Sequence, residues 1–324
     1  MKRICAFIFV WSIIAVACTD TRSNCPTVIK DPQVVNSLES DLVTPDSVIS
    51  VLDWKLTDRY IVIYTSQADG VLQLWSLPEL KYHGSYIRKG RGPGELIAAN
   101  WGQTVERNAV ILYDIPAGKL TRYLVRNDSL ETECVLDIVG HRTQDKSLFK
   151  PYVDILQMND SFYAMRASDR QKDELSIVNL RHGNVVSYAE ELLQRDPEKD
   201  QYLEYDYLLA TDGRHLVKAY MESDRIEIFE LLGTDLLPRC VITGPENSVS
   251  SGYNDIICMG DRFASDGSGE GNILEVYGYD GSQLDRIALS HPLTHILYDE
   301  KNKIFYGYNA CSEKNNFYLF RYPK

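Results

Sequence analysis

The sequence predicts an all-β protein, a six-bladed β-propeller with four-stranded blades, and three observations lead to this fold class. Short runs rich in Tyr, Ile, Val and Leu alternate with Asp, Asn and Gly along the 324 residues, as is typical of many short strands. A unit of about 50 residues recurs six times, which is the length of a propeller blade. Long helical periodicity is absent, and only residues 188–195 are expected to form a short helical turn.

The first element along the chain is an export signal. A basic pair precedes an apolar run over residues 4–17, which has the length of a secretory signal and is shorter than the about 20 residues of a membrane-spanning helix. The run ends Ala-Val-Ala before Cys18, and this resembles a bacterial lipobox, which implies removal of residues 1–17 and diacylation of Cys18. The alternative is an ordinary signal peptide with an incidental cysteine. Residues 18–32 are polar and aperiodic, so we expect a lipidated N-terminus and tether there.

The charge of the chain argues against one class of partner. Removal of the signal leaves 32 Lys and Arg against 46 Asp and Glu, a net charge of −14. Nucleic-acid binding depends on clustered Lys and Arg, and the sequence contains no such basic patch. We therefore expect no nucleic-acid partner, contact with the membrane through the lipid anchor only, and a monomer.

Six polar turns set the rhythm of the repeat. Their second residues lie 49, 52, 53, 48 and 41 positions apart, and a strand-like run follows each turn. Asp, Asn and Gly suit these turns because they tolerate the positive φ of tight hairpin connections. The turns are Asp58-Arg59, Arg107-Asn108, Asn159-Asp160, Asp212-Gly213, Gly260-Asp261 and Lys301-Asn302.

Two more strands follow the hairpin in most units. The third strand is clearest at residues 72–75, 175–178, 225–229, 274–277 and 317–320, and the fourth at 82–87, 133–138, 237–242 and 284–289. The sixth unit ends with its third strand. We therefore expect residues 33–43 to supply its fourth strand and close a propeller that spans residues 33–324. The alternative is a pair of β-sandwiches or an irregular two-domain β protein.

A glycine-rich crossover lies between the first and second units, with the sequence Gly-Arg-Gly-Pro-Gly-Glu at residues 90–95. Three glycines and a proline here are incompatible with a regular strand or helix. The motif lacks the Gly-Lys-Ser/Thr ending of a P-loop and the last glycine of a dinucleotide fingerprint. Together with the lipobox and the repeat, it resembles the TolB-like six-bladed propeller lipoproteins. This resemblance implies a propeller anchored to the outer membrane of a Gram-negative envelope, on a side left open, and it supplies no catalytic residue.

The candidate ligand-binding residues are Arg91, Glu95 and Trp101. Arg91 and Glu95 either bond locally and hold the crossover in place or face the central channel. Trp101 is either part of the core between blades or a stacking platform near the mouth of the channel. We expect the crossover to bring these three side chains near that mouth.

The sequence contains no recognisable catalytic constellation. The six histidines form no HExxH motif, and no serine lies in a GxSxG elbow. The seven cysteines show no zinc-type spacing; Cys134, Cys240 and Cys258 are expected to be small buried side chains, and one disulfide remains open. The oxygen-rich run at residues 265–272 lacks the alternating acids of an EF-hand, so we expect a surface hairpin there.

Two functions remain in consideration. We expect a non-catalytic, envelope-anchored binding module for a glycan, peptide or protein, without a cofactor. The alternative is a calcium-dependent hydrolase similar to lactonase and gluconolactonase propellers, which hold a channel calcium with Glu, Asn and Asp from separate inner strands. The candidate calcium ligands in this sequence are Glu95, Asn254 and Asp255.

Overall fold

The computed structural model of the chain describes residues 25–34, 36–43, 51–137, 152–168, 173–189, 207–221, 223–244, 253–266, 271–311 and 316–322. Every regular element in these ranges is a β-strand. None of these residues belongs to a helix long and apolar enough to cross a membrane. The predicted signal and Cys18 lie outside the described residues.

From residue 53 onward, the strands follow one another as antiparallel groups that are consecutive in sequence. The first group is β4 (Asp53–Leu56), β5 (Tyr60–Tyr64), β6 (Leu72–Ser76) and β7 (Lys81–Tyr86). The second is β8 (Ala99–Thr104), β9 (Ala109–Asp114), β10 (Lys119–Arg126) and β11 (Ser129–Asp137). The third is β12 (Tyr152–Gln157), β13 (Phe162–Ser168), β14 (Asp173–Asn179) and β15 (Asn184–Tyr188).

The second half of the chain repeats the pattern. The fourth group is β16 (Tyr207–Thr211), β17 (His215–Tyr220), β18 (Arg225–Leu232) and β19 (Asp235–Thr243). The fifth is β20 (Ile256–Met259), β21 (Arg262–Asp266), β22 (Ile273–Gly278) and β23 (Gln283–Leu289). The last is β24 (His295–Asp299), β25 (Ile304–Asn309) and β26 (Asn316–Arg321).

All six predicted turns join the first and second strands of a group, as the repeat required. The turn at Asp212-Gly213 shows why aspartate and glycine suit these positions. The Asp212 carboxylate accepts the amides of Arg214 and His215 at 2.8 and 2.6 Å. Gly213 has a φ of +96°, and a Cβ there would lie 2.6 Å from the carbonyl oxygen of Met158, so only glycine fits. The predicted third and fourth strands also coincide with observed strands.

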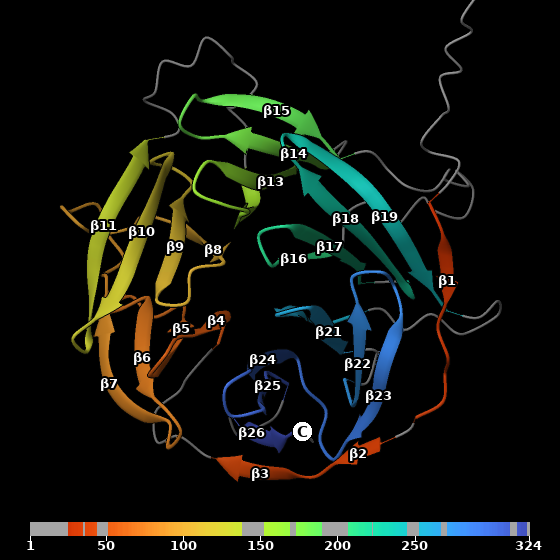
Figure 1. Cartoon of the computed structure of the whole chain (residues 1–324). Coiled ribbons are helices and arrows are strands. Elements are labelled where there is room, and N and C mark those ends of the chain that lie inside the picture. The colour runs from red at the N-terminus through yellow and green to blue at the C-terminus, as the bar shows by residue number, and fades with distance from the viewer. Residues whose placement is uncertain are drawn as a thin grey trace, which may run out of the picture.

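The groups are arranged around a common centre, each with its first strand innermost (Figure 1). Strands β8 and β12 pair in parallel through Gln103 and Leu156, which joins the second and third groups into one eight-stranded sheet. Further contacts connect the innermost strands β12 with β16, β16 with β20, β20 with β24, and β24 with β4. This radial arrangement of antiparallel strand groups is a β-propeller, as the sequence predicted.

Apolar cores fill the spaces between neighbouring groups. The cluster between the last group and the first illustrates them, because it joins Trp54 and Ile61 to Tyr306 and Phe317. The Trp54 and Phe317 rings lie 5.7 Å apart, and both side chains are buried. Large flat side chains fit these spaces because they provide much apolar contact area in a thin layer between sheets.

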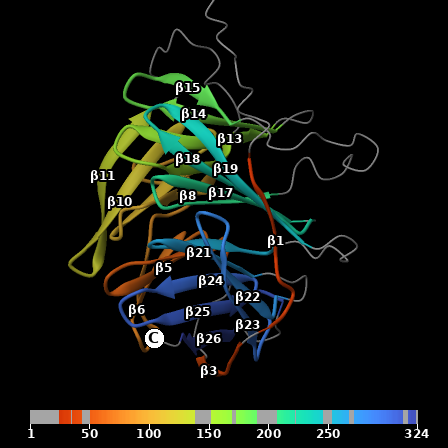
Figure 2. The same cartoon turned by 45° about the vertical axis from the view of Figure 1, so that its right-hand side comes forward.

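An N-terminal segment runs along the outer edges of the last three groups (Figures 1 and 2). Its strand β1 (Thr27–Ile29) pairs in parallel with β19, β2 (Asn36–Leu38) pairs in parallel with β23, and β3 (Ser40–Val43) pairs antiparallel with β26. The predicted pairing of residues 33–43 with the last group therefore applies to β3, while β2 adds to the fifth group.

Two sequence expectations need correction, and a third lies mostly outside the described residues. The tether predicted over residues 18–32 contains β1 and the buried Lys30, because backbone pairing at an open sheet edge needs no apolar pattern. Of the helical turn expected over residues 188–195, Tyr188 belongs to β15 and residues 190–195 lie outside the described ranges, so the rest of the turn stays a prediction. Cys258 is half-buried, whereas Cys240 is buried as expected; the side chain of Cys134 is not among those described.

Candidate functional site

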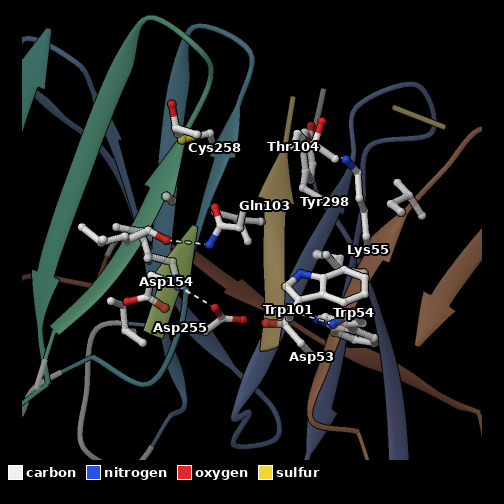
Figure 3. Close-up of a pocket in the computed structure, with 18 of the residues that line it drawn as sticks. Asp53, Trp54, Lys55, Trp101, Gln103, Thr104, Asp154, Asp255, Cys258 and Tyr298 are labelled. Carbon is white, nitrogen blue, oxygen red and sulfur yellow. Dashed lines mark hydrogen bonds between the residues drawn. The ribbon is translucent and has the colours of Figure 1, made fainter. Parts of the chain in front are cut away.

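A cavity of about 380 Å³ occupies the centre of the propeller (Figure 3). Residues from the first strand of all six groups line it, with additional contributions from Arg166 on β13 and from Met221. Along each inner strand, side chains point alternately toward the centre and away from it, so each group contributes part of its inner strand to the cavity wall. The cavity therefore collects residues that are far apart in the sequence.

One end of the cavity is acidic. Asp53 is the first residue of β4, Asp154 lies on β12, and Asp255 directly precedes β20. Figure 3 shows these three residues toward the same end of the cavity as Trp101. Asp154 forms an ion pair with the Arg166 Nε at 2.5 Å. A fourth carboxylate, that of the fully buried Asp266, accepts the Asp255 amide at 2.7 Å.

The carboxylates of Asp53 and Asp255 accept hydrogen bonds from backbone amides. The Trp54 amide donates to Asp53 at 2.7 Å. Asp255 accepts the amides of Ile256 and Ile296 at 2.8 and 2.7 Å, one on each oxygen. Within the described part of the chain, neither carboxylate forms a salt bridge with a Lys, Arg or His side chain.

The electrostatics of the acidic end follow from this arrangement. Burial raises the pKa of Asp255 to about 7, against the opposing effect of its two backbone hydrogen bonds. Burial raises the pKa of Asp53 well above its usual range, and repulsion by Asp255 and Asp154 adds to the effect. The pKa of Asp266 is raised by burial and then by Asp255. The site thus disfavours negative charge on these groups.

The opposite end of the cavity contains Lys55, whose ammonium group is hydrogen-bonded to backbone carbonyls. Lys55 donates to the carbonyl oxygens of Thr104 and Glu106, the latter at 2.7 Å. Burial lowers the pKa of Lys55 to about 7, with Glu106 opposing the shift and Arg122 adding to it. Gln103 lies between the two ends in Figure 3, where its Nε2 donates to the Leu209 carbonyl at 2.6 Å.

Aromatic side chains form another part of the wall. Trp101 stacks on Tyr64 with ring centres 6.0 Å apart and an interplanar angle of 29°. The half-buried Trp101 also packs against the core between the first and second groups. Trp101 therefore belongs to the core on one side and lines the cavity on the other, and its role as a stacking platform for a ligand stays a prediction. On the far wall, the Arg166 guanidinium lies 4.4 Å from the Tyr207 ring centre.

Glu95 bonds inside its own loop. Its carboxylate accepts the Gly92 amide at 2.7 Å. A Cβ at Gly90 would lie 2.1 Å from the same carboxylate oxygen, so the glycines make room for this side chain. Arg91 is exposed at the tip of the crossover. Of the three predicted ligand-binding residues, Trp101 is the one that lines the cavity.

The predicted calcium ligands are distributed in the same way. Asp255 lines the cavity, whereas Glu95 belongs to the crossover and the Asn254 amide donates to Asp266 at 2.7 Å. Among the described residues, no group of three or more His, Cys, Asp or Glu side chains is placed to hold a metal ion. The run at residues 265–272 is described only in part, so the expected hairpin stays a prediction.

Sequence reasoning missed Asp53, Lys55, Gln103 and Asp154. The sequence contains a usable signal for the acids, because Asp154 lies 101 positions after Asp53 and Asp255 lies 101 positions after Asp154. This interval is twice the repeat length, so an acid recurs near the start of the first strand in alternate groups. An aspartate at the start of a strand is ordinarily a turn residue, and the recurrence was therefore not recognised.

The fold is shared with solved propellers, while the sequence comparisons identify no family. No family model matches the chain, and no curated protein matches it. The β-propeller domain of Cps50 (Swd1) from Myceliophteria thermophila gives a TM-score of 0.51 at 10% identity, covering 87% of this chain and 100% of that chain. A "Putative exported protein" from Bacteroides fragilis NCTC 9343 gives 0.54 at 12% identity, covering 92% and 99%. At these identities the likeness shows the β-propeller fold alone.

Proposed function

We propose that the chain is a non-catalytic binding module of the cell envelope that holds a glycan, peptide or protein ligand at its central cavity. The observation that carries the proposal is the cavity itself, which gathers aromatic, acidic and amide side chains from the first strands of all six groups. Binding sites are typically concave and combine apolar or aromatic surface with a few placed polar groups, and the size of this cavity is typical of them.

The scaffold of the proposed site is a closed six-bladed ring. Three observations support closure. The innermost strands β24 and β4 are in contact, an apolar cluster joins the first and last groups, and β3 from the N-terminal segment pairs with β26. A closed ring fixes the distance between opposite inner strands, so it holds the cavity residues in place.

The proposed location is the outer membrane of a Gram-negative envelope, as in the TolB-like propeller lipoproteins. The support is the short apolar run that ends in small residues before Cys18. Thr27, the first residue of β1, lies nine positions after Cys18, and such a segment spans at most about 30 Å. A lipid on Cys18 would therefore keep the propeller close to the bilayer.

A glycan and peptide array tests the binding function. The purified chain is compared with Trp101→Ala and with Tyr188→Ala, a matched aromatic control on an exposed strand away from the cavity. We expect ligands that bind the wild type and the control and lose affinity for Trp101→Ala, while circular dichroism shows that all three proteins are folded. A ligand that binds all three equally would place the site elsewhere on the molecule.

The calcium-dependent lactonase remains the alternative function, and Asp255 in the cavity is the observation in its favour. Calorimetric titration of the metal-free chain with calcium, followed by a lactone hydrolysis assay, separates the two functions. Tight calcium binding that is lost in Asp255→Asn, together with hydrolysis on addition of calcium, would replace the binding-module proposal.

A further inference from the structure

We infer that the acidic end of the cavity is a subsite for a primary ammonium group on the ligand, held between Asp53 and Asp255 and beside the indole of Trp101. This inference rests on the proposed function, because it specifies the chemistry of the ligand that the cavity holds. The geometry that carries it is one end of the cavity, where two carboxylates that have no basic partner among the described residues lie near an aromatic ring.

The comparison with the buried acids of the described residues is the first argument. The described part of the chain buries three glutamates, and each contacts two basic side chains. Glu275 contacts Lys30 at 3.1 Å and Arg286 at 3.1 Å. The partners of Glu227 are Lys218 and Arg225, and those of Glu230 are Arg214 and Arg239. The buried aspartates Asp114, Asp266 and Asp299 instead accept backbone amides and have no basic partner among the described residues. Asp53 and Asp255 resemble these aspartates in their amide donors, but they differ in lining the cavity, where a ligand can reach them.

The basic groups that line the cavity are committed elsewhere. Arg166 pairs with Asp154 and stacks on Tyr207. Lys55 donates to two carbonyl oxygens toward the opposite end of the cavity. Neither is bonded to Asp53 or Asp255, so no basic side chain among the described residues pairs with these two carboxylates, and an ammonium group on a ligand could form that ion pair. A cationic ligand would form charge-assisted hydrogen bonds with the two carboxylates.

The indole of Trp101 and the volume of the cavity favour a primary ammonium group over a bare metal cation. A primary ammonium combines hydrogen bonds to carboxylates with attraction to the face of an indole. A bare divalent cation prefers several oxygen ligands at short distance, and the described residues present no such cluster. The cavity has room for a small organic group attached to the ammonium. Two sources share this chemistry, namely the lysine side chain of a peptide and the amine of an amino sugar.

Paired probes test the inference. Glucosamine is compared with N-acetylglucosamine, and the capped tripeptide Gly-Lys-Gly with its norleucine analogue, because each pair differs in the ammonium charge. Calorimetry on the purified chain should show binding of one or both ammonium probes at least about tenfold tighter than of the neutral partner. The pair that shows the difference identifies the source.

Three variants show whether the ammonium occupies the acidic end. Asp53→Asn removes the charge and keeps an oxygen for the Trp54 amide, and Asp255→Asn is the second test of the same subsite. Asp261→Asn removes a highly exposed acid outside the cavity and serves as the matched control. We expect a loss of at least about tenfold in the two cavity variants and none in the control.

Two results would overturn the inference and still leave the binding function intact. One is equal affinity for the charged and neutral probes. The other is undiminished ammonium binding by both cavity variants. If the array also yields no ligand that depends on Trp101, the binding function fails as well, so the two failures are distinguishable.

Discussion

The segment that precedes the repeats contains a buried lysine whose removal gives a sharp test of how the ring is held. Lys30 follows β1 and is only 5% exposed. Its Nζ forms ion pairs with Asp224 and, at 3.1 Å, with Glu275, and it lies 3.4 Å from the Tyr253 hydroxyl. These partners belong to the fourth and fifth groups and to the connection between them, so one side chain joins the N-terminal segment to both.

The expected cost of Lys30→Met follows from what the substitution leaves unpaired. Removing one partner of a buried ion pair costs about 3–5 kcal/mol of the free energy of unfolding. Glu275 keeps Arg286 at 3.1 Å and the Tyr277 hydroxyl at 2.9 Å, so we expect the lower limit, about 3 kcal/mol. With an unfolding entropy of about 2.1 cal/mol/K per residue over roughly 300 residues, this corresponds to a melting temperature about 5 °C lower.

Differential scanning calorimetry of the purified chain measures this change. Lys81→Met is the matched control, because Lys81 is exposed on the outer strand β7 and the same atoms are removed. We expect the control to melt with the wild type. If Lys30→Met also melts with the wild type, the buried network does not hold the N-terminal segment in place, and the reasoning from buried ion pairs fails here.

Three further predictions concern the cavity, a turn and the N-terminus. Asp53→Asn should melt above the wild type at about pH 8 and converge with it at about pH 4. Burial and the charges of Asp255 and Asp154 raise the pKa of Asp53, so the wild type loses stability as the pH rises above the unfolded-state pKa of this group. Thermal melts across this pH range check the sign of the effect. Gly213→Ala should lower the free energy of unfolding by about 2–3 kcal/mol in a urea titration, more than Gly233→Ala, where φ is also positive but no atom lies within 4 Å of the added Cβ. Expressed with its signal, the wild type should incorporate a fatty-acid probe and Cys18→Ser should not; equal labelling would exclude lipidation at this residue.

The strand pattern could be predicted from the sequence because hairpin turns are local. A turn such as Asp212-Gly213 fixes its hydrogen bonds within four residues, so composition and spacing are sufficient to place it. Strand β1 could not be placed in this way. Its three residues carry no alternation that distinguishes them from a tether, and their strand conformation depends on pairing with β19, more than 200 residues later.

The candidate site was less accessible to sequence reasoning for the same physical reason. The glycine-rich crossover was the most distinctive string in the sequence, and its Glu95 serves the conformation of its own loop. The acids of the cavity have no distinctive neighbours. Asp53 and Asp255 repel each other although about 200 positions separate them, and only the ring of inner strands brings them to one wall.

The stability of Asp53→Asn and its ligand binding can be measured on the same protein, and together they separate a binding role from a structural one. If the Asp53 carboxylate served the fold, its neutralisation would lower the melting temperature and weaken binding together. If it is kept for a ligand cation, its charge in the empty protein is a cost, so neutralisation should raise the melting temperature near neutral pH and weaken ammonium binding. The ion network around Lys30 and the cores between groups stabilise the ring far from the cavity. A gain in stability that accompanies a loss of binding would therefore show that the carboxylates at the acidic end serve ligand binding at a cost to the stability of the fold.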